Sequence, residues 1–427
     1  MMSPFSHPSS ELSHHPHTIG ESLSEAFLDS SSARDALPKQ YQAKFDELRE
    51  GILTFCHDFE IPNEALRSTE VFGAVLKSTK IPQERMLKAV LLFERLEHLV
   101  THREPLKEEL PEHLEKVEHL YHLREQYDAQ FNLLKEAGIF NERNAIVGID
   151  GKEYSIPTLE QIAERLFERE RELSTKRDQG FIKLLLVPFG MSLDAFAETF
   201  KQFLRDYKQS HPDFHLRTKT PLETSVGVYE GADVGDPPKI FYNPKFFDED
   251  HQGQTKFQIL EEQVTDPFSF QGWRVLLLQP SDPADSHFQG IASIPRQGQG
   301  KTQGKKIPRS DLEAGQTPDD YLSILQEAHD RQDSPYFQES GITIEDWMIA
   351  FMTHLKETGQ LLDENENKIY GVCCMIGSFL SFLHKREDKD FRITQALWVS
   401  HLREVVLSVL LPYGKGGSIG TRFSVVI

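Results

Sequence analysis

Cysteine, basic charge and long hydrophobic runs are all scarce in this chain of 427 residues. Three cysteines cannot build a disulfide framework, which favours a reducing compartment and a cytoplasmic protein. Lys and Arg number 47 against 67 Asp and Glu, and the net charge of −20 argues against a chain-wide nucleic-acid surface. No run approaches the roughly 20 apolar residues that a membrane helix needs, so we expect no membrane insertion.

The first 36 residues are rich in Ser, His and Pro. Such a segment buries too little apolar surface to offset the entropy of ordering, so residues 1–36 are predicted to form a disordered tail. Its four histidines offer an alternative, in which they hold a metal ion. Because the first basic residue is Arg34, this segment does not resemble a secretory signal.

Residues 38–178 have the periodicity of a helical region. Apolar side chains recur at steps of three and four near its start, at Tyr41, Phe45, Leu48, Ile52 and Phe55. Two further stripes follow Pro111 and Thr158, and Asp150-Gly151 between short apolar runs predicts a small β-hairpin over residues 144–157. Two long helices joined by a hairpin would pack as an antiparallel, coiled-coil-like arm, which could act as a spacer or in oligomerisation.

Residues 180–427 predict a mixed domain, which makes the chain an α+β protein. Residues 181–188 are a continuous apolar run typical of a buried strand, and Ser192 can cap the helix that follows. Residues 279–318 form a long loop rich in Pro and Gly. After it, Thr343 starts an apolar helix that ends at Gly359.

Catalytic motifs are weak in this sequence. Gly300-Lys301-Thr302 lacks the first glycine of a phosphate-binding loop, because Pro295, which has no N–H, stands at that position. The basic residues around it could touch an anionic partner or the acidic surface of this chain. His119 and His122 have no third metal ligand indicated, and neighbours such as Cys373-Cys374 point to opposite faces of a strand. We therefore expect no cofactor and no metal, although a catalytic site assembled in space stays open.

The C-terminal segment is poorer in charge than the rest of the chain and rich in apolar residues and glycine. Residues 393–427 contain four charged side chains, and two apolar runs flank a glycine-rich segment at 414–420. This order predicts a strand, a loop and a terminal strand within a sheet.

Several segments of the chain also carry a resemblance, which is clearest in Leu397-Trp398, Arg403, Pro412 and Gly420-Thr421-Arg422. Over roughly residues 40–427 the chain resembles an uncharacterised protein family of small-genome bacteria. The ending is similar to the C-type-lectin-like fold, shared by formylglycine-generating enzymes and by variable ligand-binding proteins diversified by retroelements. The adjacent Cys373-Cys374 do not match the separated copper-binding cysteines of those enzymes, so their activity is not carried over.

The resemblance implies a fixed scaffold that displays exchangeable side chains between Trp398 and Lys415. Trp, Tyr and Arg are frequent binding anchors, and Trp and Tyr bury much area with few rotatable bonds. The expected contact residues are Trp398, Ser400, His401, Arg403, Val406, Ser408, Leu410 and Tyr413.

Three functions follow as hypotheses. The favoured one is a non-catalytic protein that presents its lectin-like C-terminal surface to a protein or another macromolecule, with no nucleic acid expected. The alternatives are a structural or assembly protein without a variable site, and an enzyme built on the formylglycine-generating type of fold. Exposure of residues 399–413 would favour display, whereas their burial would favour a structural role.

Overall fold

The computed structural model describes residues 30–62, 65–66, 81, 83–103, 111, 114–224, 229–282, 284–285, 287–295, 312–363, 371–383 and 389–427. With 41% helix and 19% strand, the structure confirms the α+β class. It consists of two compact units, which divide between Lys116 and Val117. The expected boundary at 178–180 therefore falls inside the second unit.

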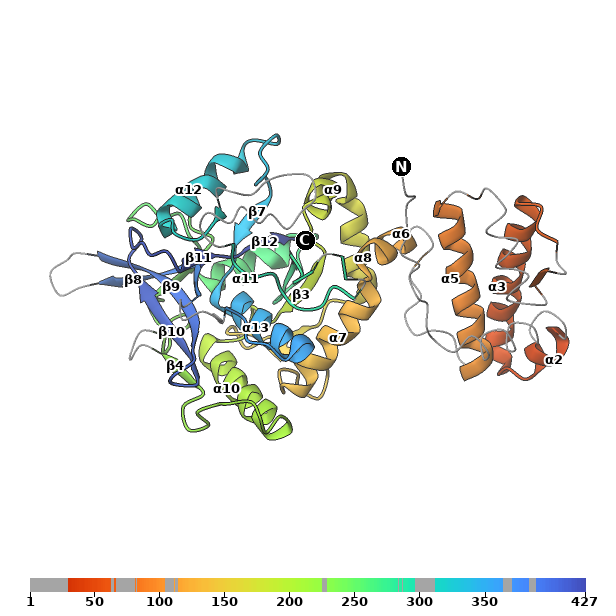
Figure 1. Cartoon of the computed structure of the whole chain (residues 1–427), viewed down its shortest axis with the longest axis horizontal. Helices are drawn as coiled ribbons and strands as arrows, with labels where there is room; N and C mark the ends of the chain where they lie inside the picture. Colours follow the sequence, from red (N-terminus) through yellow and green to blue (C-terminus); the bar gives the residue numbers. More distant parts are fainter. Residues whose placement is uncertain are drawn as a thin grey trace, which may run out of the picture. The chain divides into compact units, whose positions relative to one another are not determined.

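The first unit is helical. Helices α3 (Lys39–Asp58) and α5 (Gln83–His102) lie side by side (Figure 1) and bury Phe45, Ile52 and Leu96 between them. The predicted stripe on α3 faces this core. Ser30–Asp35 form a short helix, α2, where the sequence predicted the end of a disordered tail, because Ala33 joins the same apolar cluster. Residues 1–29, including the four histidines, lie outside the described residues.

Short helices open the second unit. They are α6 (Glu115–Tyr121), α7 (Leu123–Glu136), α8 (Leu159–Glu168) and α9 (Glu170–Asp178). Between α7 and α8, β1 (Ala145–Val147) and β2 (Glu153–Ser155) form the predicted hairpin. Thr158 caps α8 as expected, in a reciprocal capping box with Gln161.

Helix α7 packs against later segments of the second unit. Gln126 on α7 accepts a hydrogen bond from the backbone N–H of Leu184 at 2.9 Å, and its amide donates to the carbonyl of Ile182 at 2.9 Å. Gln130, one turn later, donates to Thr353 Oγ1 at 2.9 Å. Residues 117–178 are therefore part of the C-terminal core, whereas a projecting coiled-coil arm stays a prediction without support here.

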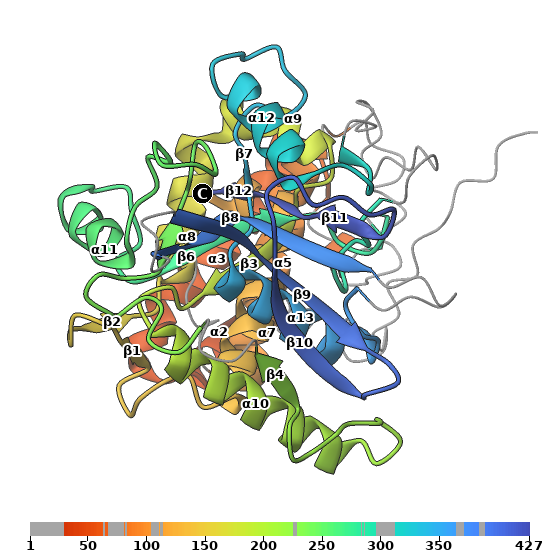
Figure 2. The same ribbon diagram turned by 90° about the vertical axis from the view of Figure 1, so that its left-hand side faces the viewer.

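Two sheets form the centre of the second unit. The first sheet is antiparallel and has the order β3 (Lys183–Val187), β6 (Arg274–Leu278), β12 (Phe423–Val426) and β7 (Glu339–Gly341). The second has the order β11 (Ile419–Thr421), β8 (Val372–Leu383), β9 (Lys389–Val399), β10 (Glu404–Leu410) and β4 (Leu222–Thr224), and β5 (Ile240–Tyr242) pairs with β8. Figure 2 shows β8, β9 and β10 side by side. The chain therefore ends in the predicted strand, loop and terminal strand.

The two sheets approach each other at two glycines. The backbone N–H of Gly377 donates to Ile342 O at 3.0 Å, next to an irregularity in β8 between Cys374 and Phe379. A Cβ atom at Gly377 would lie 2.3 Å from the carbonyl oxygen of Gly341. Only glycine lets these two strands come this close.

Helix α13 (Ile344–Thr358) lies between the sheets and the helices (Figure 1), in contact with β3, β8, β9, α7 and α10 (Leu193–Ser210). Every side chain from Ile344 to Leu355 is buried, including Glu345 and Asp346. The helix ends at Gly359, as predicted, with this glycine in the left-handed conformation, and Thr343 caps its start in a reciprocal capping box with Asp346. Helix α12 (Pro318–His329) packs on β7 and β8.

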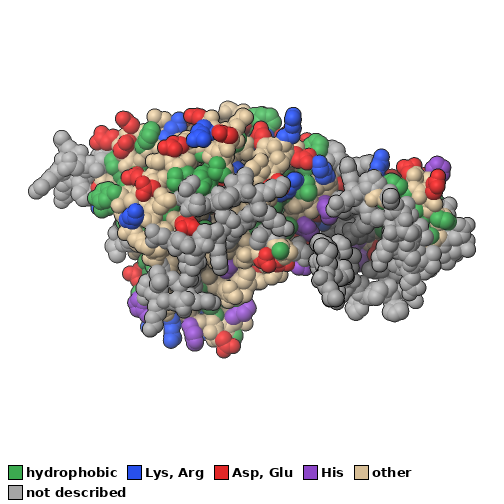
Figure 3. All heavy atoms as spheres, turned by 45° about the horizontal axis from the view of Figure 1, so that its top comes forward, with side chains coloured by type: hydrophobic (Ala, Val, Ile, Leu, Met, Phe, Trp, Pro, Cys, Tyr) green, Lys and Arg blue, Asp and Glu red, His purple; other side chains and the backbone are tan. Residues whose placement is uncertain are grey.

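The long loop after β6 is described only in part. Residues 296–311, which carry Gly300-Lys301-Thr302 and the basic cluster, lie outside the described residues. On the face in Figure 3, Asp and Glu side chains are scattered among Lys and Arg. Although the chain has a net charge of −20, its acidic side chains do not form a single acidic patch on that face.

Candidate functional site

The expected contact residues follow one hairpin, made by β9 and β10. Ser400, His401 and Arg403 are exposed in the turn between the two strands. Tyr413, which is 69% exposed, lies just beyond the other end of β10. The predicted surface is therefore elongated, with its most exposed side chains at its two ends.

Strand β10 joins these two ends. Val406, Ser408 and Leu410 are half-buried and share one face of the strand, whereas Val405 and Leu407 on the other face are buried. Over residues 405–408 this is the expected period of a strand with one face toward the core, whereas Glu404 is buried and Val409 is half-buried at the two ends.

Trp398 is a correction to the expected set. Its side chain is only 4% exposed, and its ring lies 5.8 Å from that of Phe214, measured between centroids. Trp398 lies opposite Val405 in the register, so it belongs to the inward face of the hairpin. It can support the surface but does not form part of it.

Backbone contacts hold the turn. The N–H groups of Leu402 and Arg403 both donate to the carbonyl of Val399, at 3.1 and 2.7 Å. The carbonyl of Arg403 accepts from the N–H of Arg217 at 2.8 Å. Arg403 itself has a φ of 56°, in the left-handed region that a residue with a side chain seldom adopts.

A buried carboxylate ties the same turn to a neighbouring loop. Glu404 follows the turn directly, and its side chain is fully buried. Its Oε2 accepts from Arg217 Nη1 at 3.0 Å and from Thr220 Oγ1 at 3.3 Å. The loop at 217–220 thus fixes the base of the turn while the side chains at 400–403 stay exposed.

A second group of charges lies in the interior, around Lys256 at the start of α11 (Lys256–Thr265). Lys256 Nζ lies 2.6 Å from Asp233 Oδ2 and 2.9 Å from Glu345 Oε1, and it donates to Met191 O at 2.7 Å. Tyr242 donates its hydroxyl to Glu345 Oε1 at 2.7 Å. Burial acts to lower the pKa of Lys256, but the two carboxylates raise it above its ordinary value, so the ammonium stays charged.

Arg274 and Asp346 extend this buried ionic centre. Arg274 Nη2 lies 3.3 Å from Asp346 Oδ2, which also accepts from the N–H of Thr343 at 2.8 Å. Burial raises the pKa of Asp346. One oxygen each of Asp233, Glu345 and Asp346 lacks a hydrogen-bond partner among the described residues. The three carboxylates are fully buried, which suits internal bracing better than access for a substrate.

Sequence reasoning missed this centre because its members come from separate segments. A local signal did exist, since Glu345 and Asp346 are adjacent acids within a helix that is otherwise apolar. Acids on a buried helix need a partner, so the pair could have predicted buried cations elsewhere in the chain.

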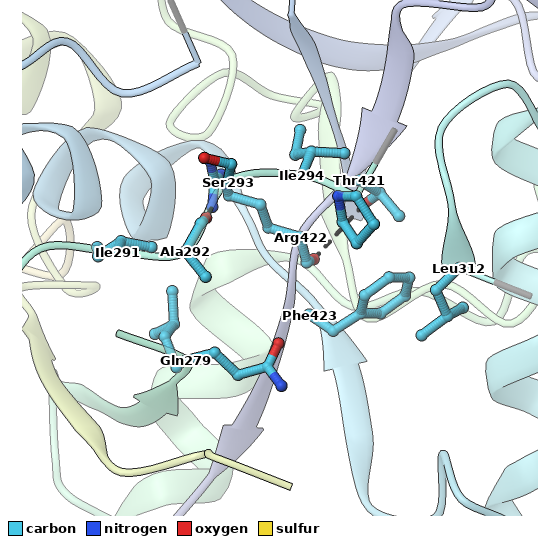
Figure 4. Close-up of a pocket in the computed structure, with 11 residues that line it drawn as sticks. Gln279, Ile291, Ala292, Ser293, Ile294, Leu312, Thr421, Arg422 and Phe423 are labelled. Carbon is cyan, nitrogen blue, oxygen red and sulfur yellow. Dashed lines mark hydrogen bonds between the residues drawn. The ribbon is translucent and has the colours of Figure 1, made fainter. Parts of the chain in front are cut away.

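Arg422 organises a third site, at the junction of β11 and β12. Its guanidinium donates to the carboxylate of Asp363, with Nε 3.2 Å from Oδ2, and to the carbonyl of Ala292. Asp363 also accepts from Trp347 Nε1 at 3.1 Å. A cavity of about 40 Å³ beside Arg422 (Figure 4) has room for a water molecule but not for an organic substrate. The Gly420-Thr421-Arg422 motif therefore supports the fold at this point.

The remaining histidine and cysteine candidates that the structure describes lie apart from further metal ligands. The rings of His119 and His122 lie 6.0 Å apart between centroids, and burial lowers the pKa of His119. Among the described residues, no group of three or more His, Cys, Asp or Glu side chains could hold a metal ion. Cys373 and Cys374 are buried on β8, as expected of core residues, and burial raises the pKa of Cys374 to about 12.

No protein-family model, curated protein or solved structure matches this chain. Within the described residues, no helix has both the length and the apolar character needed to cross a membrane. The resemblance to the C-type-lectin-like fold stays a prediction.

Proposed function

We propose that this chain is a non-catalytic, cytoplasmic binding protein that presents the β9–β10 turn and the outward face of β10 to a macromolecular partner. The observation that carries the proposal is the turn at 400–403, whose backbone is held by hydrogen bonds while its side chains are exposed. The resemblance to C-type-lectin-like display proteins that the sequence of the ending predicts would imply the same function.

Preorganisation is the physical advantage of this turn. Binding costs free energy whenever a loop must be ordered, and a loop that is already fixed avoids that cost. The contacts of Val399 and Arg217 with the turn backbone, and the buried pair of Glu404 with Arg217, provide this order before a partner arrives.

The shape of the surface favours a large partner. Strand β10 has seven residues, which at about 3.4 Å per residue separate the turn from Tyr413 by more than about 20 Å. Arg403 and Tyr413 are residue types that often anchor protein interfaces, and Val406 and Leu410 add apolar area between them. A small ligand would not span this distance.

Leu410 favours the alternative of a structural or assembly protein. Its side chain packs against the buried cluster that includes Cys374 and Ile393, so part of the proposed surface also supports the core. In that function the turn would tolerate substitution without loss of any partner.

The test is affinity capture of a partner by the full chain, with crosslinking and mass spectrometry, from a lysate of the source organism. His401→Ala with Arg403→Asn removes two exposed side chains, and Asn tolerates the left-handed backbone at 403. His57→Ala with Arg331→Asn removes the same residue types from exposed positions elsewhere. We expect the turn variant to lose at least tenfold of the captured partner and the control to keep it. Equal capture by both variants would contradict the proposal.

A further inference from the structure

A groove of about 590 Å³ lies in another part of the second unit, between the C-terminal end of α8, the loop after α11 and the strands β7 and β12. This volume is typical of sites for small organic ligands. The side chains that matter for its chemistry are Arg165, Arg169, Phe268, Phe270, Phe337 and Val426. The hairpin residues 400–413 are not among those that line it.

Apolar side chains are unusually accessible in this groove. Phe268 is 51% exposed and Val426 is 40% exposed, and Phe270 and Phe337 are partly buried beside them. The guanidinium carbon of Arg165 lies 4.5 Å from the centroid of the Phe268 ring. A flat ligand can therefore stack on an aromatic ring that is already next to a cation.

The two arginines lie one helical turn apart and have partners that a ligand can replace. Arg165 Nη1 pairs with Glu168 at 3.2 Å, and Arg169 Nε pairs with Glu172 at 3.2 Å. Both glutamates are well exposed, and exposed ion pairs contribute only about 0–1 kcal/mol. Arg165 Nε is buried and has no hydrogen-bond partner among the described residues, so the part of this guanidinium that a ligand can compete for is the Nη1 that pairs with Glu168.

The acids in the lining limit the charge of a ligand. Glu339 is matched internally by Lys176, whose Nζ lies 2.7 Å from Oε1. Asp266 is exposed, and its Oδ1 accepts from the N–H of Phe268 at 2.9 Å. Both arginines already pair with glutamates, so a negative group of a ligand has to replace Glu168 or Glu172 as their partner.

We infer that this groove binds a small organic monoanion with a flat aromatic body. The aromatic body stacks on Phe268 beside Phe270 and Phe337, and the anionic group meets Arg165 and Arg169. This site is independent of the proposed display surface, since the two share no residue.

The test uses two dyes of similar shape, the anion 8-anilinonaphthalene-1-sulfonate and the neutral N-phenyl-1-naphthylamine, titrated by fluorescence against the folded full chain. We expect the anion to bind at one saturable site, at least tenfold more tightly than the neutral dye. Arg165→Gln with Arg169→Gln should weaken the anion at least tenfold without changing the neutral dye. Phe268→Ala should weaken both dyes.

Arg171→Gln, an exposed position on α9 outside the groove, is the matched control and should change neither dye. Because Arg169 also donates to Val426 O at 2.6 Å, Arg165→Gln alone provides a second test that keeps this contact. Thermal melting of each variant confirms that the chain is folded. Equal affinity for the two dyes, or an anion affinity that the Arg165 variants leave unchanged, would overturn the inference.

Discussion

The buried ionic centre around Lys256 and the turn at 400–403 use the same kind of interaction in opposite surroundings. In both regions a fully buried glutamate meets a cation, at 2.9 Å for Glu345 with Lys256 and at 3.0 Å for Glu404 with Arg217. Lys256 is completely buried, whereas the side chain of Arg217 is 52% exposed. If the cation is lost, water can therefore partly take the place of Arg217 beside Glu404, but it cannot take the place of Lys256 beside Glu345.

Because of this difference in burial, we expect the Lys256 centre to stabilise the fold and the turn at 400–403 to present side chains to a partner. The inner pair links α11, α13 and the loop that carries Asp233, so its loss exposes carboxylates to an apolar interior. The outer pair only fixes the base of a turn whose side chains face solvent. We expect variants of the first region to change the free energy of unfolding most, and variants of the second to change recognition most.

The largest effect is expected from Lys256→Met, which leaves Asp233 and Glu345 buried without their shared cation. Breaking a buried ion pair from one side costs about 3–5 kcal/mol of unfolding free energy. Urea denaturation followed by circular dichroism measures this change. A loss below about 1 kcal/mol would mean that water reaches the centre and that the two regions are alike.

A pH-dependent effect is expected from His354 on the buried helix α13. Burial, followed by the charge of Arg422, lowers its pKa to about 4, and its Nδ1 accepts from the N–H of Ile291 at 2.9 Å. The unfolded chain, with a pKa near 6.5, takes up this proton first as the pH falls. Stability that is present above pH 6.5 is therefore lost toward pH 4, by about 2–3 kcal/mol.

His354→Asn keeps an acceptor for Ile291 but does not titrate, so its unfolding free energy should fall less between pH 7 and pH 4. His401→Asn, at an exposed position in the turn, is the matched control and should follow the wild type. Parallel pH profiles for wild type and His354→Asn would show that His354 does not carry this dependence.

A smaller effect is expected from Arg217→Gln. The variant removes the cation from Glu404 but leaves Thr220 as a donor, and solvent can reach the half-exposed site. We expect a loss of about 1–2 kcal/mol in urea denaturation, together with a clear loss of partner capture. A stability loss as large as that of Lys256→Met, with capture unchanged, would assign the turn to the structural framework.

Local signals were predicted well from the sequence. The predicted caps at Thr158 and Ser192 are correct because a cap depends on residues within one turn of the helix. The hairpin turn at Asp150-Gly151 is correct for the same reason, since Gly151 has the positive φ of 76° that such a turn requires.

Features that depend on contacts between distant segments were not predicted. The centre around Lys256 joins residues 233, 256, 274, 345 and 346, and no spacing in the sequence indicates that these segments meet. The inward position of Trp398 depends on the register of β9 against β10, because a shift by one residue would turn its ring outward. The predicted boundary at 178–180 likewise lies inside the second unit, and the hydrogen bonds of Gln126 to Leu184 and of Gln130 to Thr353 cross it.

The smallest change in stability is expected from Arg403→Gly, and it distinguishes the two regions most directly. With a φ of 56°, Arg403 is in a backbone conformation that glycine adopts without steric cost, so the variant should gain up to about 1 kcal/mol of unfolding free energy. If the arginine is retained for recognition, the same variant should lose partner capture while it melts at an equal or higher temperature. A clear drop in melting temperature with capture intact would mean that the Arg403 side chain stabilises the fold. The turn would then serve stability, as the ionic centre around Lys256 does.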